Sequence, residues 1–235
     1  MHDKKSHSNM VTTDNTLDLV LGQKAQAMGD NHISTGVETP LRPDAFDMND
    51  KEKMEIIAHH FAAIMDTLGL DLNDDSLQDT PKRVAKMFVQ EIFHGLNPAN
   101  KPEISAFDNS YDYKRMLVEK NITVKTFCEH HFLPITGKAH VGYVSNGKVI
   151  GLSKLNRIVD YYARRPQVQE RMTKQILLAL QEALDTKDVI IVVDAKHMCV
   201  SHRGIQHDES TTLTLEYSGC FENNEMRREF LDCLK

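Results

Sequence analysis

The fold is decided by the stretch Val189-Ile190-Ile191-Val192-Val193, which is five β-branched residues in a row. A run of this kind is typical of a buried strand, since no polar position interrupts it. Residues 188–195 are therefore predicted to form a strand inside a sheet. The run leads into His197-Met198-Cys199, which places a histidine and a cysteine at the end of that strand.

Further strands are predicted at 122–127, 139–145, 148–150 and 211–217. In the last of these, Leu213 and Leu215 alternate with polar residues, as expected for a strand with one buried face. Asn146-Gly147 predicts a tight hairpin turn between 139–145 and 148–150.

Two helices are predicted between these pairs of strands. Ser153 is placed to cap the first helix, and Pro166 is expected to begin the second. Their apolar stripes contain Leu155, Ile158, Val159 and Tyr162 in the first helix and Val168, Met172, Ile176, Leu180 and Leu184 in the second. The order ββααββ predicts an α+β fold, with an antiparallel sheet covered on one face by two helices. Because such a sheet has open edges, an oligomer is expected.

The first half of the chain is predicted to be a tail followed by helices. Residues 1–37 are polar and lack sustained periodicity, so a disordered tail is expected there, followed by an extended arm from residue 38. A first amphipathic helix has an apolar stripe of Met54, Ile57, Ala58, Phe61, Ile64, Met65 and Leu68. A second is expected to begin at Thr80-Pro81, with Thr80 as its N-cap, and to end at Gly95. The predicted regions are thus 1–37, a helical region at 38–118 and an α+β domain at 119–235.

Composition excludes several classes of function. The chain of 235 residues has a formal net charge of −6, which disfavours a general nucleic-acid-binding protein, so an anionic ligand requires a local basic cluster. No apolar stretch is long enough for a membrane span, and the first thirty residues lack the apolar segment of a signal peptide. A cytoplasmic location is therefore expected. Four cysteines fit thiolate ligands better than a disulfide framework, with Cys220 and Cys233 interpreted as ordinary thiols.

Two separated segments offer metal ligands. Cys128 and His131 are spaced so that a thiolate and an imidazole can converge from one turn. His197 and Cys199 add two donors that point to the same side if the chain stays extended. Two cysteines and one histidine would make a catalytic site with a position for water, whereas four ligands would make a closed structural site.

Histidines beside such a metal are candidates for proton transfer. Histidine has an unperturbed pKa of about 6.5, near working pH. If two cysteines and one histidine hold the metal, two histidines remain beside it. His130 and His197 are the candidates. The spacing alone is equally compatible with histidines that only support the ligands.

The sequence closely resembles bacterial-type GTP cyclohydrolase I, from about residue 38 to the end. The matching segments are 38–43 (ETPLRP), 79–87 (DTPKRVAKM), 128–132 (CEHHF), 151–157 (GLSKLNR), 165–171 (RPQVQER), and 197–199 (HMC) followed by 203–205 (RGI). The resemblance implies a tunnelling-type ββααββ fold, with 119–235 as the catalytic domain. It implies conversion of GTP and water to formate and 7,8-dihydroneopterin triphosphate, the entry step toward folate and other pterins, in a decamer whose active sites lie at subunit boundaries.

The resemblance also implies a role for each site residue. It implies zinc held by Cys128, His131 and Cys199, with a water in the open position attacking C8 of guanine, and His130 and His197 as proton-transfer groups. Glu170 resembles the residue that reads guanine, with Gln169 as a further base contact. Phosphate-binding positions match Lys154, Arg157, Arg203 and Arg83. Ser153 is expected to cap its helix, to bond the ribose hydroxyls, or both.

Two alternatives remain open at this point. In the first, a closed structural zinc site and the basic residues hold a nucleotide without turnover. In the second, another enzyme of the tunnelling fold acts on a pterin or purine, although the phosphate-matching residues disfavour a substrate without phosphates. Ser201-His202 and Gln206-His207 depart from the family pattern in the region of the triphosphate pocket.

Overall fold

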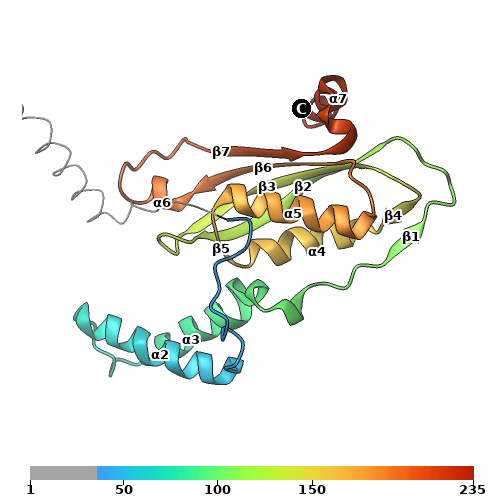
Figure 1. The fold of residues 1–235 in the computed structure, drawn as a ribbon. Coiled ribbons are helices and arrows are strands. Elements are labelled where there is room, and N and C mark those ends of the chain that lie inside the picture. The colour runs from blue at the N-terminus through green and yellow to red at the C-terminus, as the bar shows by residue number, and fades with distance from the viewer. Residues whose placement is uncertain (1–35) are drawn as a thin grey trace, which may run out of the picture. The chain divides into compact units, whose positions relative to one another are not determined.

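A five-stranded sheet lies at the centre of this computed structural model, which describes residues 36–235 (Figure 1). The predicted tail falls almost entirely on residues 1–35, which lie outside the described residues. The strand order is β5 (Pro166–Gln167), β2 (Met116–Cys128), β3 (Pro134–Val144), β6 (Val189–His197) and β7 (Thr212–Tyr217). All neighbours are antiparallel except β5 and β2, which run parallel. The predicted α+β fold with an antiparallel sheet is confirmed.

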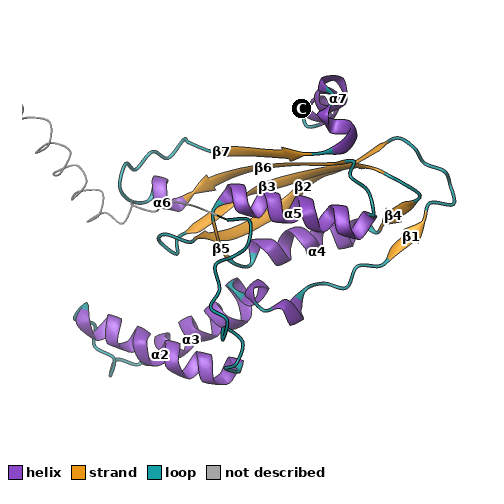
Figure 2. Cartoon of the chain, in the orientation of Figure 1, coloured by secondary structure: helices purple, strands orange, loops and turns teal. Residues whose placement is uncertain are grey.

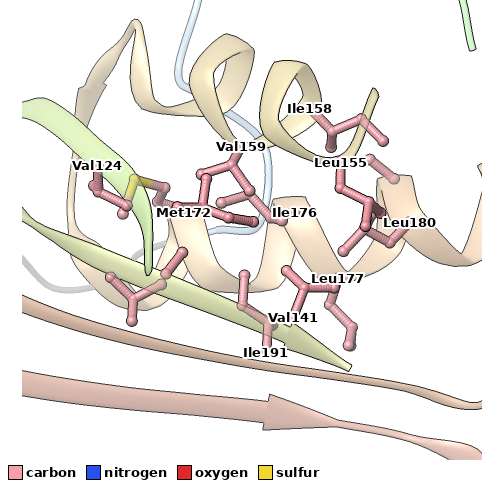
Figure 3. Packing of buried hydrophobic residues seen from close by; sticks show 14 of the residues in the cluster. Val124, Val141, Leu155, Ile158, Val159, Met172, Ile176, Leu177, Leu180 and Ile191 are labelled. Atoms are coloured by element: carbon pink, nitrogen blue, oxygen red, sulfur yellow. The ribbon is translucent and has the colours of Figure 1, made fainter. Parts of the chain in front are cut away.

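Two helices cover one face of the sheet, as predicted (Figure 2). They are α4 (Leu152–Ala163) and α5 (Gln169–Leu184). Figure 3 shows their apolar side chains facing those of the strands, with Met172 and Ile176 near Val141 and Ile191. These four side chains are fully buried, and each such burial is worth about 1.5–3 kcal/mol.

The other face of the sheet has a smaller core. Ile190 and Val192 of β6 pack there with Phe221 and Phe230. These two rings come from a short helix (Gly219–Glu222) and from α7 (Asn224–Cys233). Strand β6 is therefore buried on both faces, which explains its uninterrupted β-branched run.

The prediction that residues 139–145 and 148–150 pair as a hairpin around Asn146-Gly147 was wrong. Gly147 does adopt the left-handed conformation of a turn, with φ of 88°. However, β4 (Lys148–Ile150) pairs with β1 (Ala106–Asp108) in a separate two-stranded sheet. The reason is that β2 and β6 already occupy both edges of β3.

Two predicted helix caps and one predicted helix start were also wrong. Helix α4 begins at Leu152 with Gly151 as its N-cap, so the Ser153 side chain forms no cap. Pro166 lies in β5, and α5 begins only at Gln169. The extended conformation is favoured there because the fully buried Gln167 side chain donates to the backbone oxygen of Tyr162, at 2.9 Å.

The third error concerns the cap of α3 (Thr80–Lys86), which begins at Thr80 as predicted but has Asp79 rather than Thr80 as its N-cap. The helix continues as a π-helical stretch (Met87–Ile92), followed by short turns at His94–Leu96 and Pro98–Asn100. Gly95 lies beyond the helix end, and a Cβ there would come 2.1 Å from the backbone oxygen of Tyr161. This glycine is thus required by close packing on α4.

The first amphipathic helix is α2 (Asp50–Thr67). Asn49 and Glu52 form a reciprocal capping box at its start, with both hydrogen bonds at 3.0 Å. Among residues 36–235, none of the helices is both long enough and apolar enough to cross a membrane. Residues 37–235 form one unit, and the division at residue 118 stays a prediction.

Candidate metal centre

Cys128, His131 and Cys199 converge at one end of the sheet. Cys128 ends β2, His131 lies in the turn after it, and Cys199 lies in α6 (Met198–Ser201), directly after β6. The ends of these strands meet because β3 pairs with both, with Ile135 opposite His197. One ligand atom from each of the three residues lies within 4.8 Å of the others.

The turn that carries two of these ligands is closed by backbone hydrogen bonds. The amide of Phe132 donates to the oxygen of Cys128 at 2.8 Å, and the amide of Cys128 donates to the oxygen of Leu133 at 2.9 Å. Phe132 has φ of 51°, which is uncommon for a bulky residue. Its ring packs 5.4 Å from that of Phe93, which fixes the turn against the N-terminal helical region.

The chemistry of this donor set fits a cation of borderline softness. Burial, and then the neighbouring Cys128 sulfur, raise the pKa of Cys199 to about 11 in the metal-free chain. Two adjacent thiols of this kind become thiolates readily only when a cation compensates their charge. Two thiolates and an imidazole are typical ligands of zinc and similar metals.

His197 lies beside this group but is not part of it. Its Nε2 atom is 2.8 Å from Oε1 of Gln169, so that nitrogen is already hydrogen-bonded. Burial lowers the pKa of His197, and the charge of Glu170 partly opposes this effect. Three described ligands with a histidine alongside favour the catalytic type of site over the closed one.

His130 lies close to one member of the same group. Its Nδ1 atom is 3.7 Å from Sγ of Cys128, and its Nε2 atom is 3.8 Å from Oε1 of Glu129. No role for Glu129 is predicted from the sequence. The structure pairs its carboxylate with the buried guanidinium of Arg171 on α5.

Two of the predicted substrate residues also lie at this end. Glu170 is exposed in the first turn of α5, close enough to His197 to influence its pKa. Arg203 has Nη1 3.0 Å from Nε2 of His131. Gln169, in contrast, is buried, and its side chain is hydrogen-bonded to strands β6 and β7.

The remaining predicted substrate residues are not brought together with the metal ligands. Ser153, Lys154 and Arg157 lie in the first half of α4, next to β4 and at the opposite end of the sheet from α6 (Figure 1). Asn156, between them, donates to Glu119 at 3.3 Å. Glu119 precedes Cys128 on β2 by a stretch of strand that spans roughly 25–30 Å.

Lys154 and Arg83 complete the set of predicted phosphate contacts. Lys154 Nζ donates to the backbone oxygen of Glu103 at 2.8 Å. Arg83 is exposed on α3. Within one chain, the basic cluster that a triphosphate requires is therefore divided between two ends of the fold.

An open cavity of about 740 Å³ lies near the β4 end. Its lining includes Glu182, Asp185 and Asp188 but only one basic residue, Lys187. An acidic lining of this kind repels a triphosphate. The cavity is thus not a site for the predicted substrate.

The fold and the three converging ligands fit the class of tunnelling-fold enzymes with a metal site. Comparison with known proteins narrows this class. The family model described as GTP cyclohydrolase I matches residues 57–235. The chain therefore belongs to the GTP cyclohydrolase I family.

Curated relatives agree with this assignment. A protein of Flavobacterium johnsoniae named GTP cyclohydrolase 1 is 60% identical over 208 residues, which cover 88% of this chain and 93% of the relative. A protein of Aeromonas salmonicida with the same name is 51% identical, covering 85% and 91%. One from Escherichia coli, also of that name, is 46% identical, covering 92% and 97%.

Proposed function

We propose that the chain is a zinc-dependent GTP cyclohydrolase I. It hydrolyses the imidazole ring of guanine in GTP, releases C8 as formate and yields 7,8-dihydroneopterin triphosphate. The observation that carries the proposal is the convergence of Cys128, His131 and Cys199 with two further histidines beside them. A three-ligand site with adjacent proton-transfer groups is suited to hydrolysis rather than to structural support.

The metal ligands favour zinc. Two sulfurs and one nitrogen form a donor set used by catalytic zinc sites, and the site needs no redox-active ion for a hydrolysis. A bound zinc ion would supply Lewis acidity that makes water a competent nucleophile near neutral pH. Cys128 and Cys199, as thiolates, would supply the negative charge that retains the ion.

The surrounding residues bind the guanine base and transfer protons. Glu170 is exposed at the metal end, where its carboxylate can accept from the N1–H and the amino group of guanine together. His130 and His197 lie beside the ligands, in positions to donate and accept protons during ring opening and the later rearrangement of the sugar.

Binding of the triphosphate requires a second copy of the chain. Arg203 lies at the metal end, whereas Ser153, Lys154 and Arg157 lie in the first half of α4, where Asn156 contacts Glu119, at roughly 25–30 Å from Cys128 along β2. A triphosphate cannot span that separation from a guanine held near Glu170. A complete site therefore combines the metal end of one chain with α4 of another, in a homo-oligomer for which the family resemblance implies a decamer.

The proposal is tested by incubating the purified, zinc-loaded protein with GTP. Formate should be released in equal amounts with dihydroneopterin triphosphate, detected as a fluorescent pterin after oxidation. A zinc-loaded protein that binds GTP but releases no formate would overturn the proposal. The cytoplasmic location stays a prediction.

A further inference from the structure

The side chain of Gln169 is buried where α5 meets two strands. It is 1% exposed, and the two protons of its Nε2 atom are shared among three acceptors: the backbone oxygens of Val193 and Thr212, at 3.0 and 2.8 Å, and Oγ1 of Thr214, at 3.1 Å. Its Oε1 atom lies 2.8 Å from Nε2 of His197. Both ends of this amide are therefore committed to hydrogen bonds.

The surroundings allow only one orientation of the Gln169 amide. The backbone oxygens of Val193 and Thr212 can only accept, so the nitrogen of the amide must face them. The amide oxygen must then face His197, and an oxygen there requires a proton on Nε2 of the ring. In the neutral ring, the other nitrogen, Nδ1, keeps its lone pair.

Two threonine hydroxyls complete this arrangement. Oγ1 of Thr173 lies 2.7 Å from the backbone oxygen of Gln169 and 2.7 Å from Oγ1 of Thr214. The single proton of Thr173 goes to the backbone oxygen, because that atom cannot donate. Thr214 therefore donates to Thr173 and is left to accept from the amide nitrogen of Gln169. The hydroxyl pair and the amide thus form one network with a single consistent set of proton positions.

We propose that Thr214 and Thr173 are positioning residues that act through Gln169 to hold His197 with its proton on Nε2, so that His197 exchanges protons with the substrate at Nδ1. The inference rests on the proposed function, in which His197 transfers protons. It also changes the expected role of Gln169, which orients His197 instead of contacting the guanine base. No other titratable group is needed for this arrangement.

Removal of the Thr214 hydroxyl tests the network with little change in volume. Thr214→Val takes away one of the three acceptors of the Gln169 amide nitrogen and the donor to Thr173. The two backbone oxygens still keep the nitrogen of the amide on their side, but the amide can now shift between them, and the ring of His197 shifts with it. Misplacement of a reacting group by about 1 Å can cost on the order of 100-fold in rate. We expect kcat for formate release to fall between about 10-fold and 100-fold. The KM for GTP should change less than about twofold, since the removed hydroxyl touches no substrate-binding group.

Two variants serve as controls for this experiment. Thr214→Ser keeps the hydroxyl and should restore kcat to within about twofold of the unmodified protein. Thr186→Val removes another buried hydroxyl, bonded to Val144 at the far end of the sheet, and should lower stability without changing kcat. The inference is overturned if Thr214→Val leaves kcat unchanged, if Thr214→Ser is equally impaired, or if only KM rises.

The tautomer can be measured independently of turnover. Nitrogen-15 NMR of the zinc-loaded protein labelled in histidine, with His197→Asn to assign the signal, should show a protonated Nε2 and an unprotonated Nδ1 at pH 8.5. A protonated Nδ1 with an unprotonated Nε2 would overturn the inference. If the unmodified protein releases no formate, the proposed function fails, whereas this measurement still decides the hydrogen-bond network.

Discussion

Glu129 and Arg171, 42 residues apart in the sequence, form an ion pair next to the metal ligands. Nη2 of Arg171 lies 3.3 Å from Oε1 of Glu129, and the other pair of atoms is also in contact. The arginine side chain is only 4% exposed. The backbone amide of Glu129 donates to Gln167 at 3.0 Å, so this residue is held at both ends between Cys128 and His130. The pair therefore connects the metal turn to helix α5.

Glu129→Ala is expected to lower the free energy of unfolding by about 3 kcal/mol. The buried guanidinium would keep its desolvation cost but lose the carboxylate that offsets it. Urea unfolding followed by circular dichroism, at one fixed protein concentration, measures the change.

Glu216→Ala is the matched control for that variant. Glu216 pairs with Lys174 of the same helix at 2.9 Å, but both side chains are about one third exposed. Such a pair contributes less than about 1 kcal/mol. If both variants lose the same free energy of unfolding, burial of Arg171 does not increase the contribution of its carboxylate partner to stability.

Cys128→Ser and Cys199→Ser are each expected to reduce bound zinc by at least about tenfold, because each removes a thiolate from a three-ligand site. Elemental analysis after dialysis measures the metal, and far-ultraviolet circular dichroism should show that the fold persists. Cys233→Ser changes an exposed thiol and should retain zinc.

The same analysis separates a catalytic site from a closed structural one. His197→Ala should retain zinc, since Nε2 of that histidine is hydrogen-bonded to Gln169 and three other ligands converge without it. Loss of zinc and of the fold together in this variant would favour the four-ligand structural site instead.

Mixing two inactive variants should restore activity if a complete site is shared between chains. Cys128→Ser lacks a functional metal end and Arg157→Ala lacks a phosphate contact on α4. After subunit exchange of equal amounts, random assortment gives about a quarter of sites with both functional halves. Formate release by the mixture measures the recovery.

A double variant is the control for this complementation. Cys128→Ser combined with Arg157→Ala on one chain, exchanged with Cys128→Ser, leaves every site without a metal end and should recover nothing. If the first mixture also shows no recovery although exchange of labelled subunits is demonstrated, the complete site lies within one chain.

Cys220 is predicted to be slow to react with alkylating reagents at pH 8. Burial, followed by the nearby carboxylate of Asp188, raises the pKa of its thiol from 9.0 to about 11. The thiolate fraction at pH 8 is then roughly 100-fold lower than for a thiol of pKa 9.0. Mass spectrometry of iodoacetamide adducts, with exposed Cys233 as the internal reference, measures the ratio.

The raised pKa of Cys220 also determines how the stability of the folded protein changes with pH. A thiol with a raised pKa in the folded state contributes stability that is fully present below pH 9.0 and lost as the pH rises through about 11. Cys220→Ala should therefore weaken the decline in stability over that window. An unchanged decline, together with fast alkylation at pH 8, would contradict the assignment.

The sheet and its two covering helices could be predicted because their patterning is local and periodic. The run at Val189–Val193 and the stripe through Met172 and Ile176 report burial directly. The spacing of Cys128 and His131 likewise indicates a metal site on chemical grounds, and the structure brings Cys199 to them.

The errors arise where the decisive partner is distant in the sequence. Asn146-Gly147 has the composition of a hairpin turn, but the pairing of β4 depends on which edges of β3 are free. Proline is common at the first position of a helix, yet the pairing of Pro166 with Phe127 of β2 keeps it extended.

The partners of Glu129 and Gln169 could not be predicted for the same reason. Arg171 lies 42 residues from Glu129, and Thr214 lies 45 residues from Gln169. The available signal was the presence of polar residues at the buried start of α5, where Gln169, Arg171 and Thr173 are all nearly inaccessible. Buried polar groups require partners, although the sequence does not identify them.

A zinc titration of the metal-free protein tests whether hydrolysis of GTP by this chain depends on the metal. Formate release from GTP should be absent after chelation, rise in proportion to added zinc and reach its maximum at one zinc per chain. Formate release that is complete in zinc-free protein, or that stays absent when zinc is fully bound, would show that the chain is not a zinc-dependent GTP cyclohydrolase.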